Sequence, residues 1–189
     1  MRSLLLTWIL AGMLGLSGAW AAAQREEVVT IFEGRRVALA VPSGCTLTRE
    51  TEPGGLVAVG LTDDAAKVSA SLVFLPDPEQ ATATPRARRE RMVELFDHYV
   101  AGSTEKAMRF EELEPRRGAG TYSVFTDANL VGRADLPPGE YRHVTVGVKT
   151  WPGVLVVFRL FSNDVESASY RALLKLLRES VEERAVPLR

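Results

Sequence analysis

Cysteine is almost absent from this sequence of 189 residues, which contains only Cys45. A single cysteine cannot close a disulfide within the chain, so stability must come from a hydrophobic core. Cys45 directly follows Pro42-Ser43-Gly44, a turn sequence. Free cysteines are among the most frequently buried residues, and a reactive thiol needs a cationic neighbour or a helix N-terminus. We therefore expect Cys45 to pack in the core.

Histidine is also scarce, because His98 and His143 are the only two. They form no zinc-binding pair, and the chain after its N-terminal segment lacks the serine-elbow, phosphate-loop and dinucleotide motifs. Asp127, Asn129 and Asp135 lack the ligand spacing of a calcium loop, and such residues commonly form turns. The sequence therefore predicts no metal, no cofactor and no catalytic residue.

An excess of charge of either sign is absent as well. Lysine and arginine number 23, aspartate and glutamate 24, and the net charge is −1. Such a balance gives no electrostatic footprint for nucleic acid or for an anionic membrane. No apolar run beyond the N-terminus is long enough to span a bilayer, so we expect no stable membrane insertion once that terminus is removed.

The N-terminus itself has the features of a signal peptide, predicted over residues 1–23. Arg2 precedes an apolar run from Leu4 to Leu16, and two A-x-A cleavage patterns follow, at residues 19–21 and 21–23. The mature chain should begin near Ala22 or Gln24 and be periplasmic or secreted. Residues 24–189 have the length of one ordinary domain, which we predict to be a single α+β domain.

Most of that domain shows strand patterns. Val68 to Phe74 alternates apolar and polar residues, the period of a half-buried strand. Val154 to Phe158 is apolar on both faces, which predicts a central strand covered on both sides. The other strands are expected at Val28–Phe32, Val37–Val41, Leu56–Thr62, Met108–Leu113, Thr121–Phe125 and Tyr141–Val148.

Two helices complete the predicted fold. Thr84 and Pro85 are typical of a helix start, and the helix should end near Gly102. Asn163 and Glu166 are spaced as a capping box for a second helix, whose apolar stripe runs from Tyr170 to Val181. Helices that are apolar on one side, together with a sheet that is apolar on both faces, predict a single antiparallel β-sheet flanked by helices in α/β/α layers.

This order of elements, with a strand ending in Val41-Pro42-Ser43-Gly44, resembles the PsbP/Mog1-like superfamily, which includes DcrB-like exported bacterial envelope proteins. The resemblance covers Val28 to about Val181. Members often carry an aromatic residue, commonly tryptophan, at the position matching Cys45, where it packs into the core. The resemblance implies a non-enzymatic accessory or binding domain, with no shared catalytic residues to transfer.

One strand offers a candidate ligand site. On the predicted strand from Tyr141, the side chains of Tyr141, His143, Thr145 and Lys149 share one face, opposite Val144, Val146 and Val148. A few polar groups on an apolar wall are typical of a binding pocket. The alternative is that this face meets solvent at the end of the sheet.

Two further segments are candidates for interaction. Arginines crowd the first turns of the first helix, where cations oppose the helix dipole: Arg86, Arg88, Arg89 and Arg91. An anionic partner, such as a phospholipid headgroup or an acidic protein, would explain them, and a solvated face balanced by Glu90 and Glu94 is the alternative. The loop Leu130–Gly139 is long for its place in the sheet and is the second candidate.

The leading hypothesis is a non-enzymatic exported envelope accessory or ligand-binding domain, whose partner is an envelope protein or a small ligand. The first alternative is a protein-interaction factor that docks through the Arg-rich helix or the 130–139 loop. The second is a small hydrolase-like enzyme that uses His143 with a nearby carboxylate or Cys45.

Overall fold

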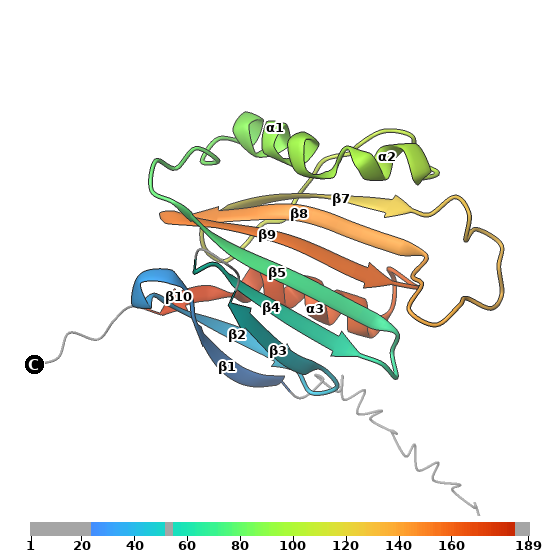
Figure 1. The fold of residues 1–189 in the computed structure, drawn as a ribbon, viewed down its shortest axis with the longest axis horizontal. Helices are drawn as coiled ribbons and strands as arrows, with labels where there is room; N and C mark the ends of the chain where they lie inside the picture. The colour runs from blue at the N-terminus through green and yellow to red at the C-terminus, as the bar shows by residue number, and fades with distance from the viewer. Residues whose placement is uncertain (1–23, 52–54, 184–189) are drawn as a thin grey trace, which may run out of the picture.

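The computed structural model describes residues 24–51 and 55–183 (Figure 1). The predicted signal peptide, residues 1–23, lies outside the described residues. The described chain has an α+β fold of antiparallel strands and α-helices, which confirms the predicted class. None of the described helices combines the length and the hydrophobicity that a membrane crossing requires.

The larger sheet has seven strands in the order β3-β4-β5-β9-β8-β7-β6, and all neighbours are antiparallel. They are β3 (Thr46–Thr51), β4 (Val57–Asp63), β5 (Val68–Asp77), β6 (Glu111–Glu112), β7 (Ala119–Thr126), β8 (His143–Trp151) and β9 (Gly153–Ser162). β9 is the middle strand and its segment Val154–Phe158 is buried, which confirms the predicted central strand. The strand predicted over Met108–Leu113 is reduced to the two residues of β6.

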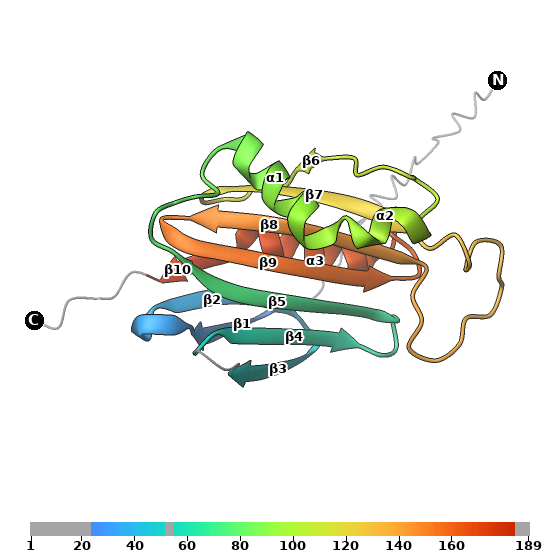
Figure 2. The same ribbon diagram turned by 45° about the horizontal axis from the view of Figure 1, so that its top comes forward.

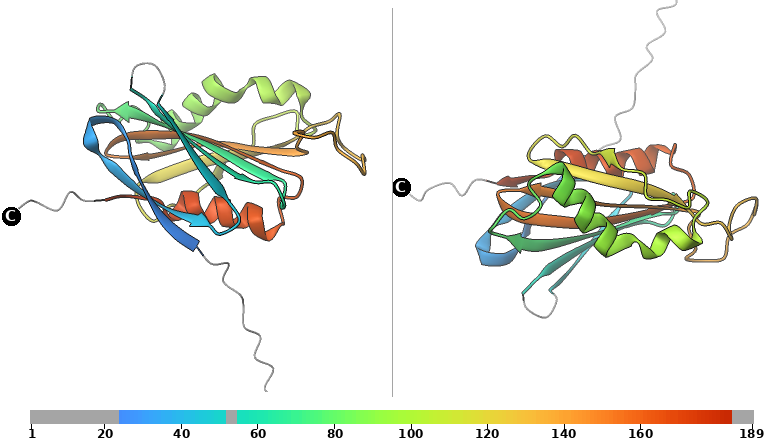
Figure 3. Two further views of the ribbon diagram at one scale, coloured as in Figure 1. Left: turned by 60° about the horizontal axis from the view of Figure 1, so that its bottom comes forward. Right: turned by 90° about the horizontal axis from the view of Figure 1, so that it is seen from above.

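A second, three-stranded sheet has the order β1-β2-β10, with strands β1 (Gln24–Thr30), β2 (Arg36–Pro42) and β10 (Val181–Glu183). The prediction of a single sheet is therefore wrong. The chain turns after β2, where the Cys45 N–H donates to Pro42 O at 3.0 Å, and β3 then pairs with β4 instead of β2. This break lets β1 and β2 form a separate layer beside α3 (Figure 3).

One face of the large sheet carries α1 (Pro85–Phe96) and α2 (His98–Gly102), which lie over the β7–β9 side (Figure 2). The predicted start is confirmed, because Thr84 Oγ1 accepts a hydrogen bond from the Ala87 N–H at 3.2 Å. The single predicted helix is divided at Asp97, although it ends at Gly102 as expected. Met92 and Phe96 of α1 form a core with the side chains of β8 and β9 on this face.

The other face carries α3 (Ala168–Glu179), which packs against β5 and β9 and against β2 of the small sheet. Its N-cap is Ser167, whose Oγ accepts from the Tyr170 N–H at 3.2 Å. The predicted cap, Asn163, instead accepts a hydrogen bond from the Arg142 N–H at 3.0 Å. The Asn163 side chain is therefore hydrogen-bonded to the residue before β8, and Ser167 caps α3 instead.

The apolar stripe of α3 is buried as predicted from Tyr170 to Leu177. Val181, which was expected to continue this stripe, lies in β10 and pairs with Ala38 of β2. The helix ends at Glu179 because Ser180 adopts an extended ψ of 129°. The C-terminal segment therefore joins the two layers: α3 covers the large sheet and β10 completes the small one.

Candidate functional site

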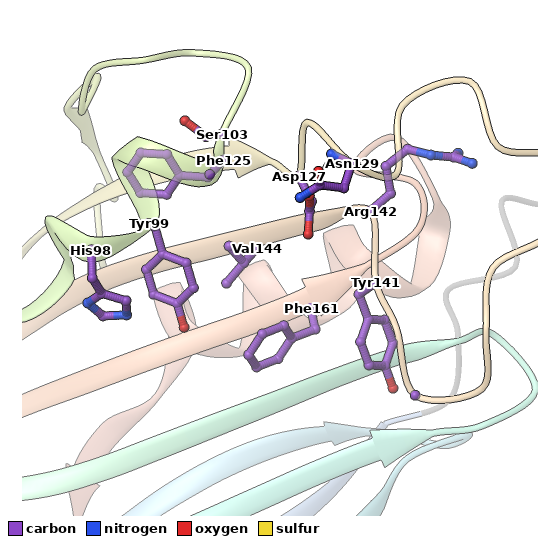
Figure 4. Close-up of a pocket in the computed structure, with 12 residues that line it drawn as sticks. His98, Tyr99, Ser103, Phe125, Asp127, Asn129, Tyr141, Arg142, Val144 and Phe161 are labelled. Atoms are coloured by element: carbon purple, nitrogen blue, oxygen red, sulfur yellow. Dashed lines mark hydrogen bonds between the residues drawn. The ribbon is translucent and has the colours of Figure 1, made fainter.

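A cavity of about 280 Å³ lies where α2, the ends of β7 and β9, and the start of β8 meet the connection between β7 and β8 (Figure 4). We call it the aromatic cavity because several rings line it: Tyr99, Phe125, Tyr141 and Phe161, with His98 beside Tyr99. Val144 of β8 lies between them. The break between α1 and α2 positions this site, since it directs α2 across the end of β7.

The rings are arranged as two pairs from different parts of the chain. Tyr99 stacks on Phe125 with centroids 6.0 Å apart and planes 19° from parallel. Tyr141 and Phe161 lie 5.7 Å apart at 41°. His98 extends the first pair, with its centroid 4.2 Å from that of Tyr99. Helix, strand and loop therefore each contribute aromatic surface to one hollow.

The polar part of the cavity comes from the start of the β7–β8 connection. Asp127 Oδ1 accepts hydrogen bonds from the Asn129 backbone N–H at 2.8 Å and from Asn129 Nδ2 at 3.1 Å. The Asp127 N–H in turn donates to Arg142 O at 2.9 Å. This turn confirms the sequence interpretation of Asp127 and Asn129 as loop-forming residues. It also fixes one carboxylate at the wall of the cavity.

Arg142 lines the same cavity, but its guanidinium extends away from the rings (Figure 4). Nη2 donates to Arg133 O at 2.8 Å, and Nη1 donates to Asn163 O at 3.4 Å. These bonds tie the long loop to the chain that follows β9. Arg142 therefore acts as a support for the loop wall.

A second hollow of about 290 Å³ lies on the other side of this loop. Leu136, Pro137 and Pro138 line it together with Asp64 and Lys67 of the β4–β5 turn. Gly139 and Tyr141 line both hollows. The last part of the predicted 130–139 loop is therefore a wall between two cavities.

The predicted binding face of β8 is divided by the structure. Tyr141 lines the aromatic cavity, whereas Thr145 and Lys149 are fully buried under α3. Thr145 Oγ1 lies 2.8 Å from Tyr170 Oη. Lys149 Nζ donates to Leu177 O at 2.7 Å, Ser180 O at 2.6 Å and Ser180 Oγ at 2.9 Å. Thr145 and Lys149 therefore meet neither a shared pocket nor solvent, because α3 covers them.

His143 is half-buried at the start of β8, on the same face. Its Nδ1 lies 3.1 Å from Thr126 Oγ1, which donates to Glu105 Oε1 at 2.9 Å. Burial, followed by the charge of Arg142, lowers the pKa of His143. The nearest carboxylate contact therefore passes through a hydroxyl, whereas a histidine–acid pair would need a direct contact of about 3 Å.

The arginines of α1 have partners within the protein. Arg88 is only 3% exposed and donates to Thr121 Oγ1 at 3.1 Å and to Ala83 O at 2.9 Å. The other three, Arg86, Arg89 and Arg91, pair with Glu90, Glu112 and Glu94 respectively. The predicted Arg-rich surface is thus reduced, because Arg88 does not reach solvent and the remaining charges are balanced.

Cys45 is 4% exposed and belongs to the main hydrophobic core, which confirms the packing prediction. Burial, with a smaller contribution from the Asp63 carboxylate, raises the pKa of its thiol. A raised pKa disfavours the thiolate that a nucleophile requires. Among the described residues, no group of three His, Cys, Asp or Glu side chains is placed to hold a metal ion.

Sequence reasoning did not identify the walls that α2 and β9 contribute. In the sequence, Tyr99 falls within the predicted first helix and Phe161 follows the apolar run Val154–Phe158, but no local pattern indicates that these two rings meet. The available signal was the long loop that begins just after Asp127 and Asn129. A scan against models of known protein families found no match, and neither did a search for similar characterised proteins.

Proposed function

We propose that this chain is a non-enzymatic, exported accessory domain of the PsbP/Mog1-like type that binds a small ligand in the aromatic cavity. The observation that carries the proposal is the cavity itself, a hollow of about 280 Å³ that is lined by four aromatic rings and by the charged residues Asp127 and Arg142. Ligand pockets typically combine apolar and aromatic walls with a few polar groups, at volumes of about 300 Å³ and above.

Two features of the chain support the proposed type of domain and its proposed export. The order of strands, helix, meander and C-terminal helix agrees with the order that the resemblance implies. The N-terminal sequence, with Arg2, an apolar run and two A-x-A sites, supports export. The process in which such a domain acts would be set by the ligand that it binds.

The hydrolase alternative is less well supported. His143 has a hydroxyl as its neighbour and a lowered pKa. Cys45 is buried in the core, where burial and the Asp63 carboxylate raise the pKa of its thiol although Arg25 lies nearby. A nucleophile with its base requires these groups within hydrogen-bond reach of one another. Binding without chemistry is the simpler function for this arrangement.

Docking of a protein through the 130–139 loop is a second candidate. Residues 131–135 are all exposed, and Val131 is 54% exposed, unusual for a large aliphatic side chain in this structure. Replacing Val131 with Asp would weaken such docking and leave small-ligand binding unchanged, because Val131 is not among the residues lining the aromatic cavity. A pull-down from envelope extract with both proteins compares the two functions.

A thermal-shift screen of residues 24–189 against metabolites, lipids and metals tests the leading proposal. A ligand that binds only the native state stabilises it by about 2.7 kcal/mol at a hundredfold excess over Kd. We expect small organic ligands to raise the melting temperature. If no compound does so at millimolar concentration, the cavity has no ligand-binding role of this kind.

A further inference from the structure

The walls of the aromatic cavity indicate which ligand chemistry it accepts, and this inference rests on the proposed function. Ring faces carry partial negative charge, so a cation within about 6 Å of a ring centroid is attracted to it. The half-buried rings of Tyr99, Tyr141 and Phe161 line the cavity, and Phe125, which is 1% exposed, stacks behind Tyr99. Several rings around one hollow are typical of sites for ammonium groups.

Two charged side chains of opposite sign, Asp127 and Arg142, line the cavity. Asp127 lines it, and its Oδ1 is held by two hydrogen bonds from Asn129. In the described part of the chain no hydrogen bond or ion pair to Asp127 Oδ2 is found. The guanidinium of Arg142 points away from the rings and is used by Arg133 O and Asn163 O (Figure 4). Asp127 therefore presents a carboxylate at the cavity wall, whereas the charged end of Arg142 is directed toward the loop and the chain after β9.

The volume of the cavity limits the class of ligand further. At about 280 Å³ it lies at the lower end of the range for ligand pockets, about 300–1,000 Å³. A compact head group with a short chain fits this volume, whereas an extended cofactor does not. Gly139 and Tyr141 line one side of the cavity, and Gly139 is exposed, so a chain attached to the head group can reach solvent on that side.

We propose that the aromatic cavity binds an alkylammonium group, with the rings of Tyr99, Tyr141 and Phe161 around the cation and Asp127 as its counter-ion. The ammonium group belongs either to a free small molecule or to the headgroup of a lipid. Both sources present the same chemistry to the rings.

The test compares choline with 3,3-dimethylbutan-1-ol, its neutral isostere of the same shape, by NMR titration of residues 24–189. Choline should bind about tenfold more tightly, because only the cation interacts with the ring faces and with Asp127. Asp127→Asn should weaken choline about tenfold and leave the neutral isostere unaffected. The asparagine keeps an Oδ1 to accept from the Asn129 N–H, so the turn is preserved.

Asp135→Asn is the matched control, since Asp135 is an exposed carboxylate of the same loop that is not among the residues lining the cavity. It should leave choline affinity unchanged. Tyr141→Leu should weaken the binding of choline and leave the binding of the neutral isostere unchanged, because leucine keeps apolar surface at the wall but removes the ring. Equal affinities for the two probes, or no effect of Asp127→Asn, would overturn the ammonium proposal while leaving a neutral ligand for the cavity.

Sedimentation with phosphatidylcholine vesicles separates the two sources. Co-sedimentation that free choline abolishes identifies a lipid headgroup, and choline binding without co-sedimentation identifies a free cation. Failure of choline to bind the wild-type protein contradicts the ammonium proposal. The proposed function itself is contradicted only if the thermal-shift screen also finds no ligand, whether charged or neutral.

Discussion

Lys149 is a fully buried lysine without a carboxylate partner among the described residues. Lysines are almost never fully buried unless they are paired. Here the ammonium lies at the C-terminal end of α3, where unpaired carbonyls attract cations, and it donates to three oxygens of Leu177 and Ser180. Lys149 therefore joins the centre of the large sheet to the end of the covering helix.

Burial lowers the pKa of Lys149 from its ordinary value of 10.5 to about 7. Between these two pH values the unfolded chain binds more protons than the folded chain, so the free energy of unfolding rises with pH. Relative to Lys149→Met, which has no titrating group here, the wild type should gain about 2 kcal/mol between pH 7 and pH 9. Urea unfolding of both proteins at the two pH values measures this gain. A difference that does not change with pH would mean that the three acceptors keep Lys149 charged.

Arg88 should contribute to stability rather than to partner binding. Arg88→Met removes buried hydrogen bonds to Thr121 Oγ1 and Ala83 O and should lower the free energy of unfolding by about 2 kcal/mol. Arg86→Met is the control, because Arg86 is 90% exposed and solvent screens its ion pair with Glu90, so this substitution should have little effect. Equal effects of the two substitutions in denaturant unfolding would contradict this role.

At the scale of single elements, β8 must fit between a strand on either side and a helical layer on each face. Gly147 allows this, because a Cβ there would lie 2.3 Å from Phe158 Cζ and 2.6 Å from Thr121 O. The space that a side chain at Gly147 would occupy is thus filled by the Phe158 ring from the neighbouring strand β9.

Gly147→Ala should consequently destabilise the protein by about 2 kcal/mol through overpacking. Gly102→Ala provides the comparison, since a Cβ at that position meets nothing within 4 Å. Thermal unfolding of the two variants should show a clear loss for the first and little change for the second. Similar melting temperatures would indicate that Phe158 moves aside without cost.

The elements were predictable from the sequence where one local pattern decided them. Thr84 as a cap and the apolar run of β9 required only local chemistry. β3 was missed because five of its six residues are exposed, so it has no apolar period. The cap of α3 was assigned wrongly because the side chain of Asn163 binds Arg142, a contact set by tertiary structure.

At the scale of the whole molecule, the sequence predicted the α+β class but not the division into two sheets. That division depends on which strand β3 pairs with after the turn at Pro42, and local patterns do not contain this choice. The candidate site was predicted only in part for the same reason, because its residues are brought together by the packing of distant elements. Tyr141 was the single predicted ligand residue that lines the aromatic cavity, because the burial of Thr145 and Lys149 depends on where α3 packs.

Residues from distant parts of the chain line the aromatic cavity. Its function is therefore tested best by comparing a substitution of one lining residue with the same substitution at a position outside the cavity. Phe161 and Phe110 are both half-buried phenylalanines; Phe161 lines the cavity, whereas Phe110 packs against Arg89, whose guanidinium carbon lies 5.6 Å from the ring centroid. Both Phe→Ala variants should fold, since neither ring is fully buried.

The most direct measurement is an NMR titration of wild type, Phe161→Ala and Phe110→Ala with the strongest ligand from the thermal-shift screen. The account predicts that the ligand shifts the amide signals of Asp127, Gly139 and Val144 in the wild type and in Phe110→Ala. Phe161→Ala should bind at least about tenfold more weakly, as expected for loss of a buried aromatic contact. Unchanged affinity in Phe161→Ala, with shifts confined to other surfaces, would contradict the account.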